Sequence, residues 1–113
     1  MNTMTEAADA ELLALGVEFR KAWDAERAAF APWGGETKDI AIDAAHGACA
    51  ALADAINKIT PKTMDGVRVV AMVWGWMHYL SEHPGEYEGA DSEFPGERAG
   101  HGVMTFLLKD CTA

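Results

Sequence analysis

The feature that most restricts the fold of this chain is the stretch from Val67 to Leu80, which reads VRVVAMVWGWMHYL. It contains two Trp and two Met but a single Lys or Arg, although the whole chain has a net charge of −9. A helix built from it is apolar nearly all round, apart from a narrow stripe that includes Arg68 and His78. Such a helix has to be covered on nearly every side, by a membrane, by the rest of the chain or by a second chain.

A membrane is the weakest of these three explanations, because a spanning helix needs about 20 predominantly apolar residues. This stretch is shorter and carries Arg68 and His78, so we expect no membrane partner. A central core helix and a homodimer interface both remain open. The face that a second copy of the chain would cover consists of large apolar residues: Val69, Met72, Val73, Trp76 and Leu80.

The rest of the chain predicts an all-α fold, because it is rich in Ala and has only 4 Pro in 113 residues. We expect one helical domain over residues 1–113, a bundle of three long helices and a short C-terminal helix. The predicted helices cover residues 4–31, 38–59, 64–82 and 98–110, and an acidic loop covers residues 83–97.

Two of these helices show a clear apolar face at helical spacing. Leu12, Phe19 and Trp23 share one face of the first helix, and Cys49 and Ile56 share one face of the second. Between the second and third helices, Pro61 ends one helix and Thr63 is suited to cap the next. These residues predict the centre of the core and the position of its sharpest turn.

The charge balance excludes some partners. With 18 acidic and 9 basic residues and a pI near 4.7, the chain is repelled by nucleic acid, so we expect no direct nucleic-acid binding. A protein with a basic surface is the partner that this charge favours. Cys49 and Cys111 match no metal or redox motif, and the first residues do not resemble a secretory signal, so we expect a cytoplasmic protein without a cofactor.

The acidic loop is the strongest functional signal. Its acids alternate with aromatic residues, a composition that suits docking on a basic protein groove or imitation of nucleic-acid phosphates. The alternative is a solvated loop that only keeps the protein soluble. The residues that would contact a partner are Glu86, Tyr87, Glu88, Asp91, Glu93 and Phe94.

Signals for chemistry are weaker. His78, Glu82 and His83 are candidate metal ligands, since His78 and Glu82 are four residues apart on one helix face. The alternative is a histidine at a helix C-terminus, where its charge suits the helix dipole. An enzyme would need a pocket that brings a histidine together with a cysteine or with carboxylates, and we identify no catalytic residue.

The turn INKITPKTMDGVRVVAMVW resembles a pattern in small helical proteins of unknown function from bacterial genomes and prophages. The matching residues are Ile59, Pro61, Thr63, Met64 and Gly66. The resemblance covers the middle third of the chain and implies a phage or mobile-element context, with no activity to carry over.

From these observations we expect a non-enzymatic module that binds another protein. A sharper form of this hypothesis is an inhibitor, similar to an anti-CRISPR protein, whose acidic surface occupies the nucleic-acid-binding site of its target. A small metal-dependent enzyme is the remaining alternative.

Overall fold

The computed structural model describes residues 3–29, 36–80 and 85–109 and is all-α over these residues, as predicted. Its helices are α1 (Thr3–Ala29), α2 (Glu36–Asn57), α3 (Met64–His78) and α4 (Pro95–Leu108). No strand occurs in the described part of the chain, and its one isolated β-bridge joins Tyr79 to Tyr87. None of the described helices has the length and the apolar run that a bilayer crossing requires.

Two predicted helix boundaries are wrong by more than the usual uncertainty of helix ends. The third helix ends at His78 rather than residue 82, because Tyr79 leaves the helix to form the bridge with Tyr87. The fourth begins at Pro95 rather than residue 98, so the acidic loop ends earlier than residue 97. A proline fits the first helical turn, where its missing N–H has no partner to lose.

The chain forms two compact units, residues 1–69 and residues 70–113, called unit 1 and unit 2 below. Their border lies inside α3. Unit 1 contains α1, α2 and the first turns of α3, and unit 2 contains the remainder of α3, the loop and α4. The single domain expected over residues 1–113 stays a prediction.

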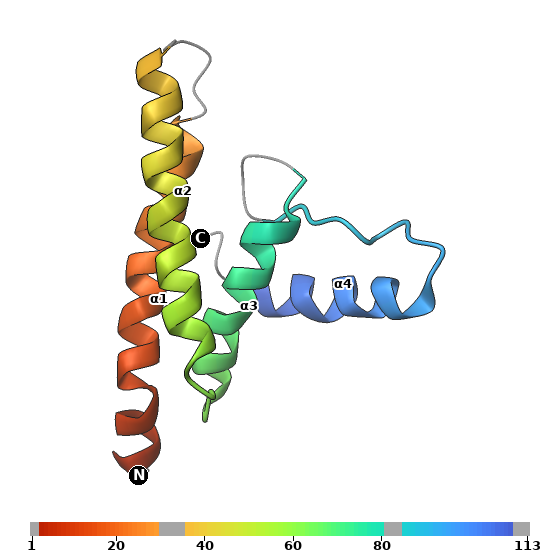
Figure 1. The fold of residues 1–113 in the computed structure, drawn as a ribbon. Helices are drawn as coiled ribbons and strands as arrows, with labels where there is room; N and C mark the ends of the chain where they lie inside the picture. Colours follow the sequence, from red (N-terminus) through yellow and green to blue (C-terminus); the bar gives the residue numbers. More distant parts are fainter. Residues whose placement is uncertain (1–2, 30–35, 81–84, 110–113) are drawn as a thin grey trace. The chain divides into compact units, whose positions relative to one another are not determined.

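The core of unit 1 lies between α1 and α2, which run antiparallel side by side (Figure 1). The predicted apolar faces are buried: Leu12, Phe19, Cys49 and Ile56 are 0% exposed and Trp23 is 1% exposed. Burying each large side chain of this kind stabilises a fold by about 1.5–3 kcal/mol. The helical spacing of these residues is therefore what pairs the two helices.

A buried carboxylate joins α1 to the turn between α2 and α3. Asp9 accepts hydrogen bonds from the backbone N–H of Lys62 at 3.0 Å, from the backbone N–H of Thr63 at 2.8 Å, and from the Thr63 hydroxyl. The same hydroxyl accepts a bond from the N–H of Gly66 at 3.0 Å, which confirms Thr63 as the cap of α3. Asp9 thus orients the residue that starts the next helix.

The hydrogen bonds of Asp9 also keep it charged. The bond from the Thr63 hydroxyl is the main cause that lowers the pKa of Asp9 below 3.8. Burial opposes this by raising the pKa, and the N–H groups of Lys62 and Thr63 add to the lowering. The net direction shows that the folded chain favours the carboxylate form.

Two glycines allow α3 to begin close to α1. A Cβ atom at Gly66 would meet the carboxylate of Asp9 and would lie 3.1 Å from the Leu12 side chain. A Cβ atom at Gly16 would lie 2.7 Å from a methyl group of Val69. A larger residue at either place has to push these neighbours away, so the packing of unit 1 requires glycine there.

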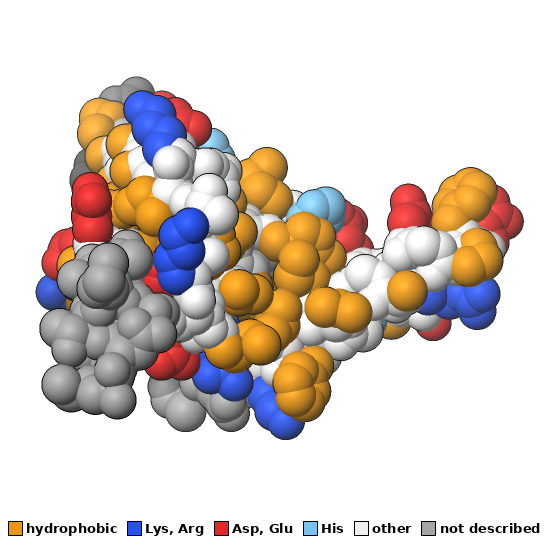
Figure 2. All heavy atoms as spheres, turned by 90° about the horizontal axis from the view of Figure 1, so that it is seen from below, with side chains coloured by type: hydrophobic (Ala, Val, Ile, Leu, Met, Phe, Trp, Pro, Cys, Tyr) orange, Lys and Arg blue, Asp and Glu red, His pale blue; other side chains and the backbone are white. Residues whose placement is uncertain are grey.

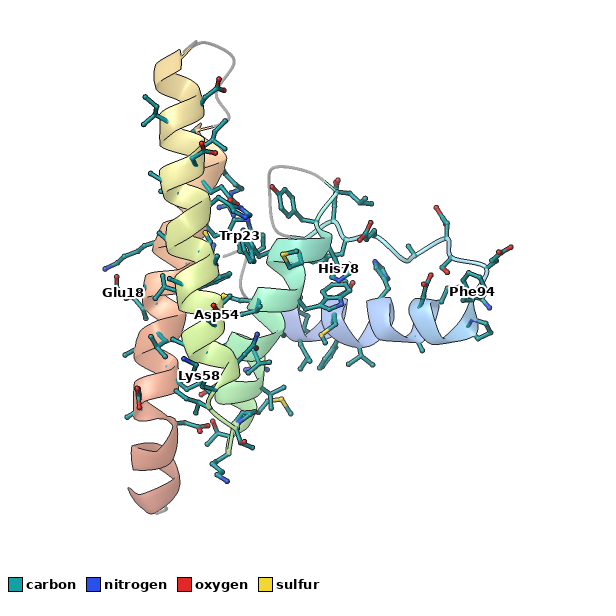
Figure 3. The ribbon with its side chains drawn as sticks, viewed as in Figure 1. Glu18, Trp23, Asp54, Lys58, His78 and Phe94 are labelled. Carbon is teal, nitrogen blue, oxygen red and sulfur yellow. The ribbon has the colours of Figure 1, made fainter. Side chains whose placement is uncertain are left out.

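We expect Asp9→Asn to lower stability at neutral pH and to do so less in acid. A carboxyl with a lowered folded pKa contributes stability above its unfolded pKa and loses it as pH falls through the folded value. The urea midpoints of the two proteins should therefore differ most at pH 7 and converge below about pH 3.8. Asp54→Asn, at an exposed position on α2, is the control and should show no such convergence (Figure 3). A difference between the urea midpoints of Asp9→Asn and the unaltered protein that stays constant over this pH range would contradict the lowered pKa of Asp9.

We expect Gly66→Ala to destabilise the protein by at least about 1 kcal/mol, because the new methyl group would overpack the site against Asp9 and Leu12. Gly47→Ala is a matched control in the interior of α2, where an added Cβ has no neighbour within 4 Å. It should stabilise by about 0.5–1 kcal/mol, the usual gain of Ala over Gly in a helix. Urea unfolding measures the stability of both variants. If both substitutions change the free energy of unfolding in the same direction, close packing at Gly66 is contradicted.

Candidate functional site

Unit 2 contains a groove of about 650 Å³ between the end of α3, the loop and the first half of α4. We call it the acidic groove. The side chains in its lining that can carry charge or stack are Trp74, His78, Glu88, Asp91, Glu97 and His101. Figure 3 shows His78 at the end of α3 and Phe94 at the start of α4. Between them, residues 88–92 of the loop form one side of this groove.

Backbone hydrogen bonds fold the first part of the loop back on the end of α3. The N–H of Leu80 donates to the carbonyl of Glu86, and the N–H of Glu88 donates to the carbonyl of His78, both at 2.8 Å. Gly89 follows with φ of +110°, a backbone conformation that side-chain-bearing residues rarely adopt. This geometry brings Glu88 next to His78, ten residues earlier in the chain.

Tyr87 anchors the loop. It is 2% exposed, and its ring lies 5.5 Å from the ring of Trp74 at a tilt of 49°. The apolar ring of Tyr87 is therefore held inside the chain. The prediction that Tyr87 contacts a partner stays a prediction.

His78 joins the charged and aromatic parts of the groove. Its Nδ1 lies 2.7 Å from Oε1 of Glu88, and its ring stacks on Trp74 with centroids 4.6 Å apart and an interplanar angle of 24°. The His78 and Glu88 side chains are 41% and 56% exposed, so the pair adds little to stability. Its effect is to hold the Glu88 carboxylate beside the stacked rings.

Two of the three predicted metal ligands, Glu82 and His83, lie outside the described residues. The third, His78, is the last residue of α3 and is paired with Glu88. Residues 3–29, 36–80 and 85–109 contain no group of three His, Cys, Asp or Glu residues that could hold a metal ion.

The far side of the groove is formed by the start of α4. The Ser92 hydroxyl donates to Oε1 of Glu97 and accepts from the N–H of Phe94 at 3.1 Å, which fixes the turn into the helix. One turn later, Nε2 of His101 lies 3.3 Å from the Thr105 hydroxyl. The Ser92 hydroxyl in the groove is thus bonded to a carboxylate.

The groove is acidic. Glu88, Asp91 and Glu97 line it, whereas no Lys or Arg does so among the described residues. The nearby Glu86, Glu93 and Phe94 are exposed, and Figure 2 shows acidic, hydrophobic and basic side chains at the end of unit 2. Five of the six predicted partner-binding residues are therefore exposed, and Glu88 and Asp91 line the groove.

Sequence reasoning did not place Trp74, Glu97 and His101 in a site, and it did not predict that His78 pairs with Glu88. Trp74 belonged to the predicted third helix, Glu97 to the predicted acidic loop and His101 to the predicted fourth helix. These residues line one groove because of the path of the loop, and hydrophobic periodicity does not predict that path. Gly85 and Gly89 are the local signals in the sequence, because glycine favours a reversal of the chain, and both have a positive φ in the structure.

The predicted dimer face is partly covered within one chain. Val69, Met72 and Trp76 are 6%, 7% and 8% exposed, Val73 is half-buried and Leu80 is 66% exposed. A second copy would therefore meet only part of this face. The homodimer stays a prediction.

A second polar cluster lies in unit 1. The buried Glu26 lies 2.8 Å from Nδ1 of the exposed His46, and Cys49 is buried nearby. Burial first, and the charge of Glu26 second, raise the pKa of Cys49 to about 12. Burial therefore favours the protonated thiol of Cys49 at neutral pH.

Comparison of the chain with protein-family models, with curated proteins and with solved structures gives no match.

We expect Gly89→Ala to disturb the groove. The substitution strains a backbone at φ +110° and places a Cβ 3.3 Å from that of His101, a combined cost of about 1–3 kcal/mol. Gly102→Ala, also in unit 2, has open space around the new methyl group and should be neutral or stabilising. Thermal unfolding and the near-ultraviolet spectrum of the aromatic residues measure the effects. Identical behaviour of the two variants would show that the loop tolerates a side chain at Gly89.

Proposed function

We propose that this protein is a non-enzymatic interaction module whose acidic groove binds a basic segment of another protein. The observation that carries the proposal is a concavity of about 650 Å³ whose charged lining contains carboxylates and histidines but no described Lys or Arg. The volume is within the range of about 300–1,000 Å³ that ligand sites usually occupy.

Charge supports this assignment in two ways. The net charge of −9 attracts a basic partner from a distance and speeds the encounter. At contact, Glu88, Asp91 and Glu97 offer acceptors from the loop and from α4 within one concave site. A solvated loop needs no such concavity.

Imitation of nucleic acid is a second candidate, and the exposed acids of the loop favour it. Glu86, Glu88, Asp91 and Glu93 are all exposed over a short segment, as the phosphates of a strand would be. In that case the partner would be a nucleic-acid-binding protein, and DNA or RNA would compete with this chain for it. If the first candidate is correct, the acidic groove binds the basic segment of the partner, and DNA or RNA does not compete for it.

The test compares two triple variants with the same change of charge. Glu88→Gln, Asp91→Asn and Glu97→Gln neutralise the groove, whereas Glu11→Gln, Glu18→Gln and Asp54→Asn neutralise exposed positions of unit 1, where Glu18 points outward from α1 (Figure 3). Labelled basic peptides from a randomised library are the probe, and fluorescence anisotropy at low salt and at about 0.15 M salt gives Kd.

We expect the groove triple variant to bind at least about tenfold more weakly than the unit 1 triple variant, because only it loses direct acceptors. A competition experiment tests the second candidate, imitation of nucleic acid. If that candidate is correct, a DNA duplex should displace this chain from a basic nucleic-acid-binding protein. Equal weakening by both triple variants would show that binding responds to net charge alone, and would overturn the assignment to the groove.

A further inference from the structure

We infer that the acidic groove selects arginine over lysine, and that its occupant is the guanidinium group of an arginine on the partner protein. This inference rests on the proposed function and adds the identity of the bound side chain. It follows from two features of the groove, a pair of stacked rings and a carboxylate fixed beside them. Among the described residues, histidines line the groove but no Lys or Arg does.

The aromatic wall is the first part of the argument. Trp74 and His78 are stacked with centroids 4.6 Å apart, and both line the groove. A guanidinium is planar and weakly hydrated, so it can stack on such rings, whereas an ammonium is a compact and strongly hydrated charge. The wall therefore favours a flat cation.

The position of Glu88 is the second part. His78 Nδ1 lies 2.7 Å from Oε1 of Glu88, so the carboxylate is held next to the rings before any ligand arrives. A carboxylate has about four acceptor positions, so this one contact leaves others for a ligand. A guanidinium can form two parallel hydrogen bonds to one carboxylate, and a carboxylate already in place loses less freedom on binding.

The third part is space. Gly89, Ala90, Gly96 and Gly100 line the groove with small or absent side chains, and a Cβ added at Gly96 or Gly100 would meet no atom within 4 Å. An arginine and the extended backbone on either side of it need this room. Asp91 and Glu97 lie on the same lining and complement the charge of a segment with further basic residues.

The experiment uses one peptide that binds the full-length protein in the preceding assay, made in three forms. The residue that contributes most to binding is Arg, Lys or citrulline, which is uncharged and has nearly the shape of arginine. We expect the Arg peptide to bind about tenfold more tightly than the Lys peptide, and the citrulline peptide to bind no better than the Lys peptide.

Two aromatic variants test the wall. Trp74→Leu should bring the Arg-to-Lys affinity ratio close to one, whereas Phe106→Leu, a matched change at an exposed aromatic residue outside the groove, should leave the ratio unchanged. Trp74 also packs on Tyr87, so Trp74→Phe, which keeps an aromatic ring, is the second variant and should give an intermediate ratio.

Backbone NMR of the unaltered protein provides a measurement that needs no variant. The Arg peptide should shift the amide signals of Gly89 and His101, and N-acetyl-arginine amide should shift the same signals but bind far more weakly. Binding of this small compound as tightly as the peptide would overturn the assignment to a partner protein.

The remaining outcomes separate the two proposals. Equal affinity for the Arg and Lys peptides, with the groove triple variant still weakened, would overturn arginine selection and leave the proposed function intact. Equal binding by the two triple variants would overturn the proposed function and this inference together.

Discussion

The bonds that Asp9 receives from the turn before α3 govern the structure of unit 1. A single carboxylate on α1 accepts bonds from two successive backbone N–H groups and from the hydroxyl of Thr63, which itself caps α3. The start of one helix is therefore specified by a residue more than fifty positions earlier. Gly66 makes this possible, because any side chain at that position would occupy the space of the carboxylate.

Much of unit 1 could be predicted from the sequence because its determinants are local and periodic. Leu12, Phe19 and Trp23 recur at helical spacing, and all are buried. Thr63 was predicted as a cap from its position after Pro61 and is one. Asp9 was not predicted, since an acid in an acidic N-terminal segment has no local signal that distinguishes a buried tertiary partner from a solvated residue.

The acidic groove could not be predicted in the same way. Its composition was recognised, but its geometry depends on three non-local events: the end of α3 at His78, the pairing of Tyr79 with Tyr87, and the early start of α4 at Pro95. Each overrides a reasonable local expectation. Apolar periodicity predicted that α3 would continue, and the proline predicted a loop. In the resulting turn, His78 pairs with Glu88.

The two tryptophans of the apolar stretch from Val67 to Leu80 have different surroundings. Trp74 and Trp76 are two positions apart and therefore point in different directions on the helix. Trp76 is 8% exposed and belongs to the core, whereas Trp74 packs on Tyr87 and also lines the groove. An apolar helix does not need cover on every side if one of its large rings lines a groove. The ring of Trp74 stacks on His78 and also packs against Tyr87. Because both contacts lie within the chain, the position of this ring does not depend on a bound partner.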